Sequence, residues 1–476
     1  MSNTVQKQDL KQIGNYLYEI PKTFRPDMKV PARFYSTPGF IEKLLEERAI
    51  EQLINTATLD GVYKYVVAMA DIHEGYGFPI GGVVAVDKTR GVISPGGVGY
   101  DINCGVRLLK TGLTVEELNA RKIDLMEEIF KTVPAGLASK SAVKISFEEL
   151  DKFLEGGAEY AAQKGFGTVK DLENIEENGR LRIADSGKVS DRAKKRGRDQ
   201  LGTLGSGNHF LEIQRVTDIF DKEVADKLNI QQDEVFVMIH TGSRGLGHQV
   251  ASDYIEIMRA AMKKYNIKVP DPELVSAPFN SEEGQDYFKA MAAAANFAWA
   301  NRQIIMEKTR RAFNRTLRIP KEQIYLIYDV AHNIAKVEGN LIVHRKGATR
   351  AFGPGNSNIP PVYRDIGQPV IIPGSMGTAS YLMLGTKKAE EETFGSAAHG
   401  AGRALSRHKA KRIVRGEELR TELEKEGIAV FSTSNVGLAE EAPVAYKNID
   451  EVANITAETG IAKKVVRLKP IGVVKG

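Results

Sequence analysis

The sequence predicts an α+β protein. Short runs rich in β-branched and aromatic residues alternate along the chain with longer amphipathic stretches that favour helix. Loops of unusual composition are spread between Asp71 and Lys475 and are not confined to one segment. If these loops meet at one site, residues 1–476 form a single large domain, although a length of 476 residues alone would suggest about two or three.

Four segments have the composition of buried strands. They are short, they are rich in β-branched or aromatic side chains, and each ends in a polar or Gly-rich loop. These predicted strands cover residues 65–69, 235–239, 324–330 and 369–372.

Several other stretches have helical signatures. Thr114 and Ser146 each precede a glutamate by three positions, which is typical of capping boxes that open amphipathic helices. Residues 286–314 lack Gly and Pro and contain the only tryptophan, Trp299, so we expect one long helix whose aromatic and Met side chains belong to the core. Residues 404–414 are rich in Lys and Arg and predict a basic helix whose N-terminus would favour an anion.

The composition is that of a globular protein, with 42% hydrophobic and 27% charged residues. No run approaches the roughly 18 consecutive apolar residues of a membrane span, and we expect a cytoplasmic protein. Lys plus Arg exceed Asp plus Glu by 66 − 61 = 5, which permits a polyanionic partner without requiring one. The single cysteine, Cys104, cannot form an internal disulfide and must be structural, a metal ligand or a reactive thiol.

Two Gly-rich segments offer metal ligands. In residues 96–105, Asp101 stands three positions before Cys104, among glycines that allow close backbone approach. In residues 205–212, His209 follows a Gly-Ser-Gly turn, whereas a core histidine would normally lie in an apolar periodic segment. A lone buried cysteine is usually a small hydrophobic residue, so the interpretation of Cys104 depends on the other candidate ligands.

Two further histidines directly follow predicted strands. His240 comes after residues 235–239 and precedes a Gly-rich loop with Arg244, and His332 closely follows residues 324–330. Functional side chains often collect in such loops. Three imidazoles, one thiolate and one carboxylate suit Zn, Mn, Fe or Co, and because five ligands exceed one tetrahedral ion, two metals bridged by Cys104 are expected.

The C-terminal half contains loops of a different kind, at residues 373–381 and 395–403. Their many Gly, Ser and Ala residues suit phosphate oxygens held by backbone N–H groups and hydroxyls. His399 is therefore expected to meet a phosphate, either as a nucleophile on phosphorus or as a hydrogen-bond donor, and the residues leave both roles open. Basic segments at 344–350 and 191–198 suggest a polyphosphate or nucleic-acid groove, although a solvated face is the simpler interpretation of the second.

Familiar nucleotide and metal motifs are missing from the sequence. It has no G-x-x-x-x-G-K-[ST] loop and no CxxC pair, which argues against a P-loop NTPase and a zinc ribbon. Lys336 in Lys-Val-Glu-Gly is a weak echo of the K-x-D-G motif of lysine-dependent ligases, with glutamate in place of aspartate.

Seven motifs, in order along the chain, make it resemble the RtcB family of RNA ligases, and most closely its archaeal-type members. The motifs are Asp101-Ile-Asn-Cys-Gly, Gly207-Asn-His-Phe, His240-Thr-Gly-Ser-Arg-Gly, His332-Asn, His344-Arg-Lys-Gly-Ala, Pro373-Gly-Ser-Met-Gly-Thr and His399-Gly-Ala-Gly-Arg. The resemblance covers nearly the whole chain. It implies a family-specific α+β fold with a β-sheet core, surrounding helices and a deep central cleft.

The resemblance also implies a ligase that uses GTP and manganese. In the family, the histidine that matches His399 attacks the α-phosphate of GTP, GMP then passes to an RNA 3'-phosphate, and a 5'-hydroxyl attacks that activated end. A 2',3'-cyclic phosphate is first opened at the same site. The implied biology is tRNA splicing or RNA repair by a monomer, with RNA as substrate and archease as a candidate activating partner. Two Mn²⁺ ions are held by residues that match Asp101, Cys104, His209, His240 and His332.

The family's guanylate contacts carry over by residue type. Glu212 suits a purine edge, and Lys475 suits a ribose or phosphate. Arg244, Arg403 and Arg407 are candidates for contacts with RNA phosphates. The full set of expected GTP contacts is Asn208, Phe210, Glu212, Asn333, Pro373, Gly374, Ser375, Met376, Ser380, Gly400, Ala401, Gly402 and Lys475.

Two rival functions are compatible with parts of this pattern. A dimetal phosphodiesterase could open cyclic phosphates and stop there, but hydrolysis needs no second nucleophile such as His399. A non-catalytic RNA-binding protein would be expected to have aromatic-rich faces and would have no need of five metal-type ligands.

Overall fold

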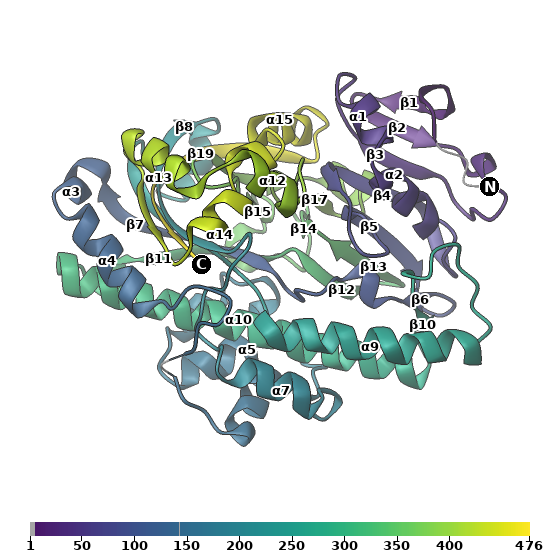
Figure 1. The fold of residues 1–476 in the computed structure, drawn as a ribbon, viewed down its shortest axis with the longest axis horizontal. Coiled ribbons are helices and arrows are strands. Elements are labelled where there is room, and N and C mark those ends of the chain that lie inside the picture. The colour runs from purple at the N-terminus through teal and green to yellow at the C-terminus, as the bar shows by residue number, and fades with distance from the viewer. Residues whose placement is uncertain (1–4, 142) are drawn as a thin grey trace.

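The structure is a computed structural model that describes residues 5–141 and 143–476. In this part of the chain, two large β-sheets are surrounded by helices, which confirms the predicted α+β class (Figure 1). The first sheet contains the N-terminal strands and one hairpin from the second half of the chain. In spatial order it consists of β1 (Lys11–Gly14), β2 (Leu17–Ile20), β3 (Ala32–Tyr35), β4 (Val62–His73), β5 (Ile80–Asp87), β13 (Leu341–Lys346) and β12 (Asn333–Glu338).

The second sheet joins strands that are far apart in the sequence, and its neighbours along the main path are antiparallel. The strand β18 (Ala429–Ser432) adds a parallel pairing to β19. In spatial order the sheet consists of β11 (Tyr325–Ala331), β7 (Gly105–Thr114), β9 (Glu234–Thr241), β8 (Phe210–Ile219), β19 (Ala462–Lys475), β16 (Ser380–Gly385) and β15 (Pro369–Ile372).

The four predicted strands are all present. Residues 65–69 lie within β4 and residues 235–239 within β9, while β11 is shifted by one residue from the predicted segment 324–330. The strand β15 has the predicted bounds, 369–372. Short β-branched runs therefore located the buried strands correctly, although two of the observed strands are longer.

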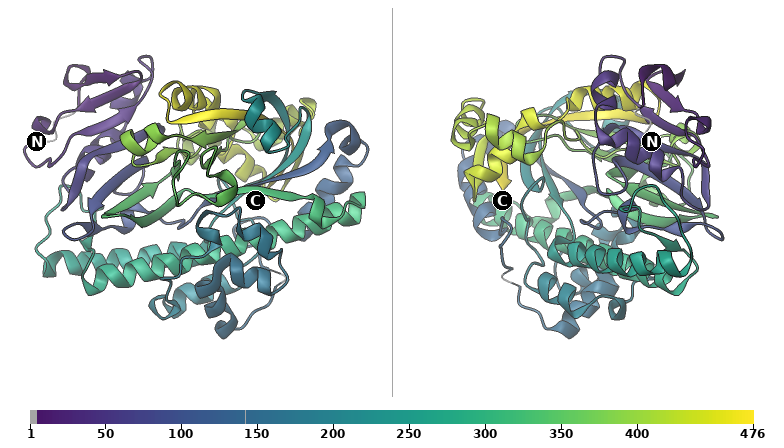
Figure 2. Two further views of the ribbon diagram at one scale, coloured as in Figure 1. Left: turned by 180° about the vertical axis from the view of Figure 1, so that it is seen from behind. Right: turned by 45° about the vertical axis from the view of Figure 1, so that its right-hand side comes forward.

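A long helix, α10 (Glu282–Leu317), runs along one side of the molecule beneath both sheets (Figures 1 and 2). It contains the predicted stretch 286–314, and Trp299 is fully buried as expected. The helices α9 (Arg244–Lys264) and α5 (Phe147–Gln163) pack against α10, and α7 (Asp191–Arg198) packs against α9 and α5. Because α10 contacts both β9 and β12, it fixes the two sheets relative to each other.

The predicted capping boxes differ in outcome. Thr114 and Glu117 form the complete reciprocal box at the start of α3. Ser146 accepts the amide of Glu149 at the start of α5, but the Glu149 carboxylate pairs with Lys164 (2.8 Å) and does not return to the cap. The shorter helices are α1 (Ile41–Leu45), α2 (Arg48–Thr56), α3 (Val115–Asn119), α4 (Lys122–Thr132), α6 (Val169–Leu172), α8 (Lys222–Lys227), α11 (Lys387–Glu392), α12 (Arg407–Ile413), α13 (Gly416–Lys425), α14 (Asn435–Glu440) and α15 (Ile449–Glu458).

The predicted basic helix 404–414 is shorter than expected. The helix α12 begins at Arg407, eight residues after His399, so its N-terminus does not follow His399 directly. The reason is that the amides of Ala404 and Leu405 both donate to the carbonyl of Ala445, which holds this segment extended until Ser406 caps the helix. None of the helices within residues 5–141 and 143–476 combines the length and apolar composition of a membrane span.

Candidate active site

The register of the second sheet brings the predicted metal ligands to one edge. Gly105, the first residue of β7, pairs with Thr241 on β9 and with Ala331 on β11. On the other side of β9, Phe210 pairs with His240. Cys104, His209, His240 and His332 therefore stand at neighbouring strand ends. His332 is also the single residue between β11 and β12, where the chain passes from one sheet to the other.

Three of these side chains form a compact group that could hold a metal ion. The ligand atoms of Asp101, Cys104 and His209 all lie within 4.8 Å of one another. His209 Nε2 is 2.8 Å from Asp101 Oδ2 and 3.6 Å from Cys104 Sγ. Gly205 has φ +99°, and a Cβ there would lie 2.0 Å from the Arg244 guanidinium, so glycine is needed in the turn before His209.

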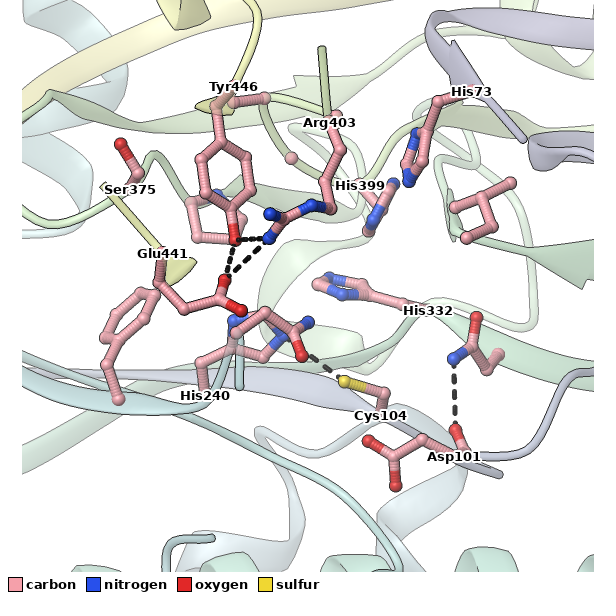
Figure 3. A pocket seen from close by; sticks show the side chains of 18 of the residues that line it. His73, Asp101, Cys104, His240, His332, Ser375, His399, Arg403, Glu441 and Tyr446 are labelled. Atoms are coloured by element: carbon pink, nitrogen blue, oxygen red, sulfur yellow. Dashed lines mark hydrogen bonds and ion pairs between the residues drawn. The ribbon is translucent and has the colours of Figure 1, made fainter. Parts of the chain in front are cut away.

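His240 and His332 extend this group toward His399. His240 Nε2 lies 3.3 Å from Cys104 Sγ, and its ring is 5.6 Å from the ring of His332. The rings of His332 and His399 are 5.3 Å apart, and Figure 3 shows His332 between His399 and Cys104. Among the described residues, neither ring nitrogen of the buried His332 has a hydrogen-bond partner, and neither does Nδ1 of His240. Such orphaned nitrogens beside a thiol and a carboxylate fit a transition-metal site.

The electrostatics of this group depend on burial. Burial and the nearby Asp101 carboxylate raise the pKa of the Cys104 thiol well above its usual value. Burial also acts to raise the pKa of Asp101, but the charge and hydrogen bond of His209 outweigh it and lower that pKa to about 2. A thiolate here would therefore need a bound cation to stabilise it.

A buried arginine ties the ligand-bearing segments together. Arg302 on α10 is fully buried and forms a two-pronged ion pair with Asp329 on β11 (2.8 and 2.9 Å). Its guanidinium also donates to the carbonyl oxygens of Asn103 and Thr241, both at 2.9 Å. These partners neighbour Cys104, His240 and the strand that leads to His332, so α10 supports the site from below.

His399 is held by an aspartate on a strand of the first sheet. Its Nδ1 lies 2.6 Å from Oδ2 of Asp71 on β4, and the same oxygen accepts the backbone amides of His399 (2.9 Å) and Gly400 (3.2 Å). The short strands β14 (Ala348–Arg350) and β17 (Ser396–Ala398) pair just before His399 and deliver it to this position. Asp71 is fully buried, and although burial acts to raise its pKa, the charge and hydrogen bonds of His399 lower it.

The Gly-rich loops were predicted to hold phosphate through backbone amides, but four of these amides donate to other groups of the protein. The amides of His399 and Gly400 donate to Asp71, the amide of Gly374 donates to the Ser380 hydroxyl (3.1 Å), and the amide of Ser375 donates to Thr378 (2.8 Å). These small residues shape the loops through internal hydrogen bonds. Any phosphate held here must therefore rely on other donors.

Most of the expected GTP contacts gather around one pocket with a volume of about 360 Å³. Glu212 and Ser380 are buried behind its wall, where both contact Gln214. Burial raises the pKa of Glu212 to about 8. Lys475 pairs with Phe210 across β19 and β8, and burial lowers its pKa to about 8. Those of the expected contacts that line the pocket are Asn208, Phe210, Asn333, Pro373, Gly374, Ser375, Met376, Gly400, Ala401, Gly402 and Lys475.

The three arginines proposed to contact RNA differ in position. Arg403 and Arg407 line the pocket, and each donates to the buried Glu441 at 3.0 Å. Figure 3 shows Glu441, Arg403 and Tyr446 together on the wall opposite Asp101. Arg244 is buried and donates to Thr203 (3.3 Å), so it lies behind the lining residues.

The structure corrects one sequence interpretation in part and agrees with two others. In the basic segment 344–350, Arg345 and Arg350 are buried in ion pairs with Glu338 and Glu177 and are not available to RNA, whereas Lys346 lines the pocket. Lys336 is buried between Glu176 and Glu177 and is not among the described lining residues, which excludes it as the nucleophile of this pocket. The run 191–198 is an amphipathic helix with a mostly solvated basic face.

The sequence analysis assigned no role to Asp71 or Glu441. Asp71 could have been found, because it stands near the end of a β-rich run and is followed by His73, the same pattern that identified His240 and His332. Glu441 follows α14 in an irregular connection and has no comparable signal.

Comparisons with known proteins identify the family of this chain. The family model described as "tRNA-splicing ligase RtcB" matches residues 52–476. The tRNA-splicing ligases RtcB of Methanococcus maripaludis and Thermococcus kodakarensis are each 53% identical to this chain, over 99% and 98% of it and over 100% and 99% of their own lengths. The corresponding protein of Archaeoglobus fulgidus is 52% identical over 98% of the chain and 99% of its own length. The chain therefore belongs to the RtcB family.

Proposed function

We propose that this protein is an RNA ligase that joins 2',3'-cyclic-phosphate or 3'-phosphate ends to 5'-hydroxyl ends in tRNA splicing or RNA repair. The observation that carries the proposal is the Asp71–His399 pair, with 2.6 Å between Asp71 Oδ2 and His399 Nδ1, beside a group of metal-type ligands. The names of the archaeal relatives support an action on tRNA. Because the pocket takes residues from position 73 to position 475, we also propose one catalytic domain.

The Asp71 contact prepares His399 for attack on phosphorus. When the ring donates Nδ1–H to a carboxylate, the neutral tautomer has its lone pair on Nε2, and the aspartate stabilises the positive charge that forms on the ring. His399 Nε2 then attacks the α-phosphorus of GTP, forming a P–N bond while the bond to pyrophosphate breaks. A histidine whose unprotonated Nε2 is oriented in this way can act as a nucleophile, which favours this role over simple phosphate binding.

The remaining residues have roles in binding and charge neutralisation. Asp101, Cys104, His209, His240 and His332 would hold manganese, and such ions would supply Lewis-acid stabilisation of phosphoryl oxygens. Glu212 would bind the purine edge and Lys475 the ribose or a phosphate, and Phe210 lies beside them to orient the nucleotide. These residues are buried, so they would recognise the nucleotide away from water.

Two further transfers complete the proposed reaction. An oxygen of the RNA 3'-phosphate attacks phosphorus on His399, so the P–N bond breaks and GMP moves to the RNA end. The 5'-hydroxyl then attacks the RNA phosphorus and releases GMP, which leaves a 3'-5' linkage. Arg403 and Arg407, held toward the pocket by Glu441, are suited to neutralise these phosphates, and Arg244 stays a predicted contact of the RNA backbone.

The test uses RNA with a labelled 3'-phosphate, a 5'-hydroxyl partner strand, GTP and manganese. We expect joined product whose label resists phosphatase, and no product with His399→Ala or with a 5'-phosphate and 3'-hydroxyl pair. Assays with and without archease would then address the predicted activating partner, and sedimentation would test the predicted monomer. Product that stops at a free 3'-phosphate under every metal and nucleotide tried would establish the rival phosphodiesterase.

A further inference from the structure

Three aromatic rings stand in a row at the edge of the pocket, and the proposed reaction uses none of them. The rings of Tyr100 and His248 stack with centroids 4.7 Å apart and planes 24° apart. The ring of Tyr76 is also next to Tyr100, with centroids 5.6 Å apart and the planes tilted by 59°. Tyr76 and Tyr100 line the same pocket as His399. We call these three residues the aromatic row.

The aromatic row is fixed by the segments that hold the metal-type ligands. Tyr100 immediately precedes Asp101, and His248 lies in the first turns of α9, just after the loop that follows His240. The two tyrosines are only partly buried and His248 is exposed, whereas core aromatics such as Trp299 are fully buried. Part of this stacked surface is therefore open to a ligand that enters the pocket.

Cations and carboxylates both lie near the aromatic row. Arg196 lies close enough to His248 to affect its charge, and Lys346 donates to the carbonyl of Tyr76 from within the pocket wall. Arg259 donates to the Tyr76 hydroxyl (3.5 Å) but is paired with Glu256, and the Glu273 carboxylate accepts the amide of Gly77 (2.9 Å). Arg196 and Lys346 are therefore the basic groups placed to meet a phosphate beside the rings.

The rings themselves are neutral near pH 7. Burial raises the pKa of Tyr76, and burial together with Arg196 lowers that of His248. Neutral aromatic rings flanked by cations are the combination that proteins use to hold single-stranded nucleic acid, with bases on the rings and phosphates on the charges.

We propose that the aromatic row is a base-stacking subsite for the nucleobase at the RNA end, beside the reacting phosphate. This inference rests on the proposed RNA ligase function and extends it from the phosphate to the base. The predicted GTP contacts Phe210 and Lys475 line the same pocket but lie on β8 and β19, where Phe210 packs edge-on against His240 (5.3 Å between rings), so we assign the aromatic row to RNA and not to the nucleotide.

Fluorescence of 2-aminopurine tests the proposal, because stacking quenches this base. The probe is placed at the terminal position of either the 5'-hydroxyl strand or the 3'-phosphate strand, and the strand that is quenched identifies which end occupies the row. We expect wild-type protein to quench one of them. Tyr100→Ala should abolish the quenching and weaken binding about 5- to 150-fold, the range expected for one lost base stack.

The controls separate stacking from other effects. Tyr100→Phe should retain the quenching, and Tyr63→Ala, which removes an exposed tyrosine outside the pocket, should behave as wild type. Tyr76→Ala gives a second test if Tyr100→Ala does not fold. RNA with an abasic terminal residue should bind wild type as weakly as intact RNA binds Tyr100→Ala, and the two changes together should add nothing further.

The outcomes distinguish this inference from the proposed function. If wild type joins RNA but neither the tyrosine variants nor the abasic end alters binding or quenching, the aromatic row is packing only and the inference is overturned. Equal quenching of a free 2-aminopurine nucleotide, without preference for an RNA end, would also overturn it. If wild type neither binds nor joins RNA ends, the proposed function itself fails.

Discussion

The contact between Asp71 and His399 makes a quantitative prediction. In Asp71→Asn, the amide oxygen can take the place of Oδ2 and still accept Nδ1–H and the backbone amides of His399 and Gly400, but it carries no negative charge. The variant therefore stabilises less well the positive charge that forms on the ring when Nε2 attacks phosphorus. A hydrogen bond to a charged group contributes roughly 1.5–3 kcal/mol and one between neutral groups roughly 0.5–1.5 kcal/mol, so about 1–1.5 kcal/mol is lost, and about 1.4 kcal/mol corresponds to tenfold in rate. We therefore expect nucleotidylation of His399 to slow by about 5- to 10-fold.

Intact-mass measurement of the GMP adduct after mixing with GTP and manganese gives this rate. Asp271→Asn is the matched control, because Asp271 is also buried and accepts a backbone amide (2.9 Å from Glu273) but is not among the described residues that line the pocket. The control should react at the wild-type rate. Thermal unfolding of both variants checks that the fold is retained. A rate for folded Asp71→Asn within twofold of wild type would refute the role given to this aspartate.

Three further predictions follow from the site. Cys104→Ala should lose manganese binding in calorimetry and should form no GMP adduct, while its unfolding temperature without metal stays close to that of wild type. Manganese affinity equal to that of wild type would contradict the assignment of Cys104 as a thiolate ligand. The adduct should disappear in His399→Ala but persist in Lys336→Met, because Lys336 is neutralised by Glu176 and Glu177. The reverse result would identify Lys336 as the nucleophile. Because burial raises the pKa of Glu212 from 4.5 to about 8, the stability that its protonated form provides is lost as the pH rises through that range. Glu212→Gln should therefore match wild type in unfolding temperature at pH 5 and exceed it at pH 9, measured without nucleotide, and a variant that is less stable at pH 9 would contradict the buried, unpaired carboxylate.

Local patterns in the sequence were sufficient to predict several strands, the long helix and many of the candidate site residues. The strand-to-histidine pattern identified His240 and His332, and the Gly-Ser-Gly turn identified His209, because each depends on backbone geometry within a few residues. The same reasoning failed for Arg345 and Arg350. A run of Arg and Lys looks the same in sequence whether it faces RNA or, as for Arg345 and Arg350, is buried against carboxylates from distant segments.

The sequence by itself determined the α+β class, the long helix, the single thiol and the histidines available as ligands or nucleophile. Only the tertiary structure decided which groups meet. Sheet register places Gly105 opposite both Thr241 and Ala331, which aligns three ligand-bearing strand ends, and Arg302 then ties their backbones to α10. The pairing of Asp71 with His399 joins residues 328 positions apart, one on β4 and the other directly after β17. Such contacts depend on packing between distant segments, and no local periodicity or propensity encodes them.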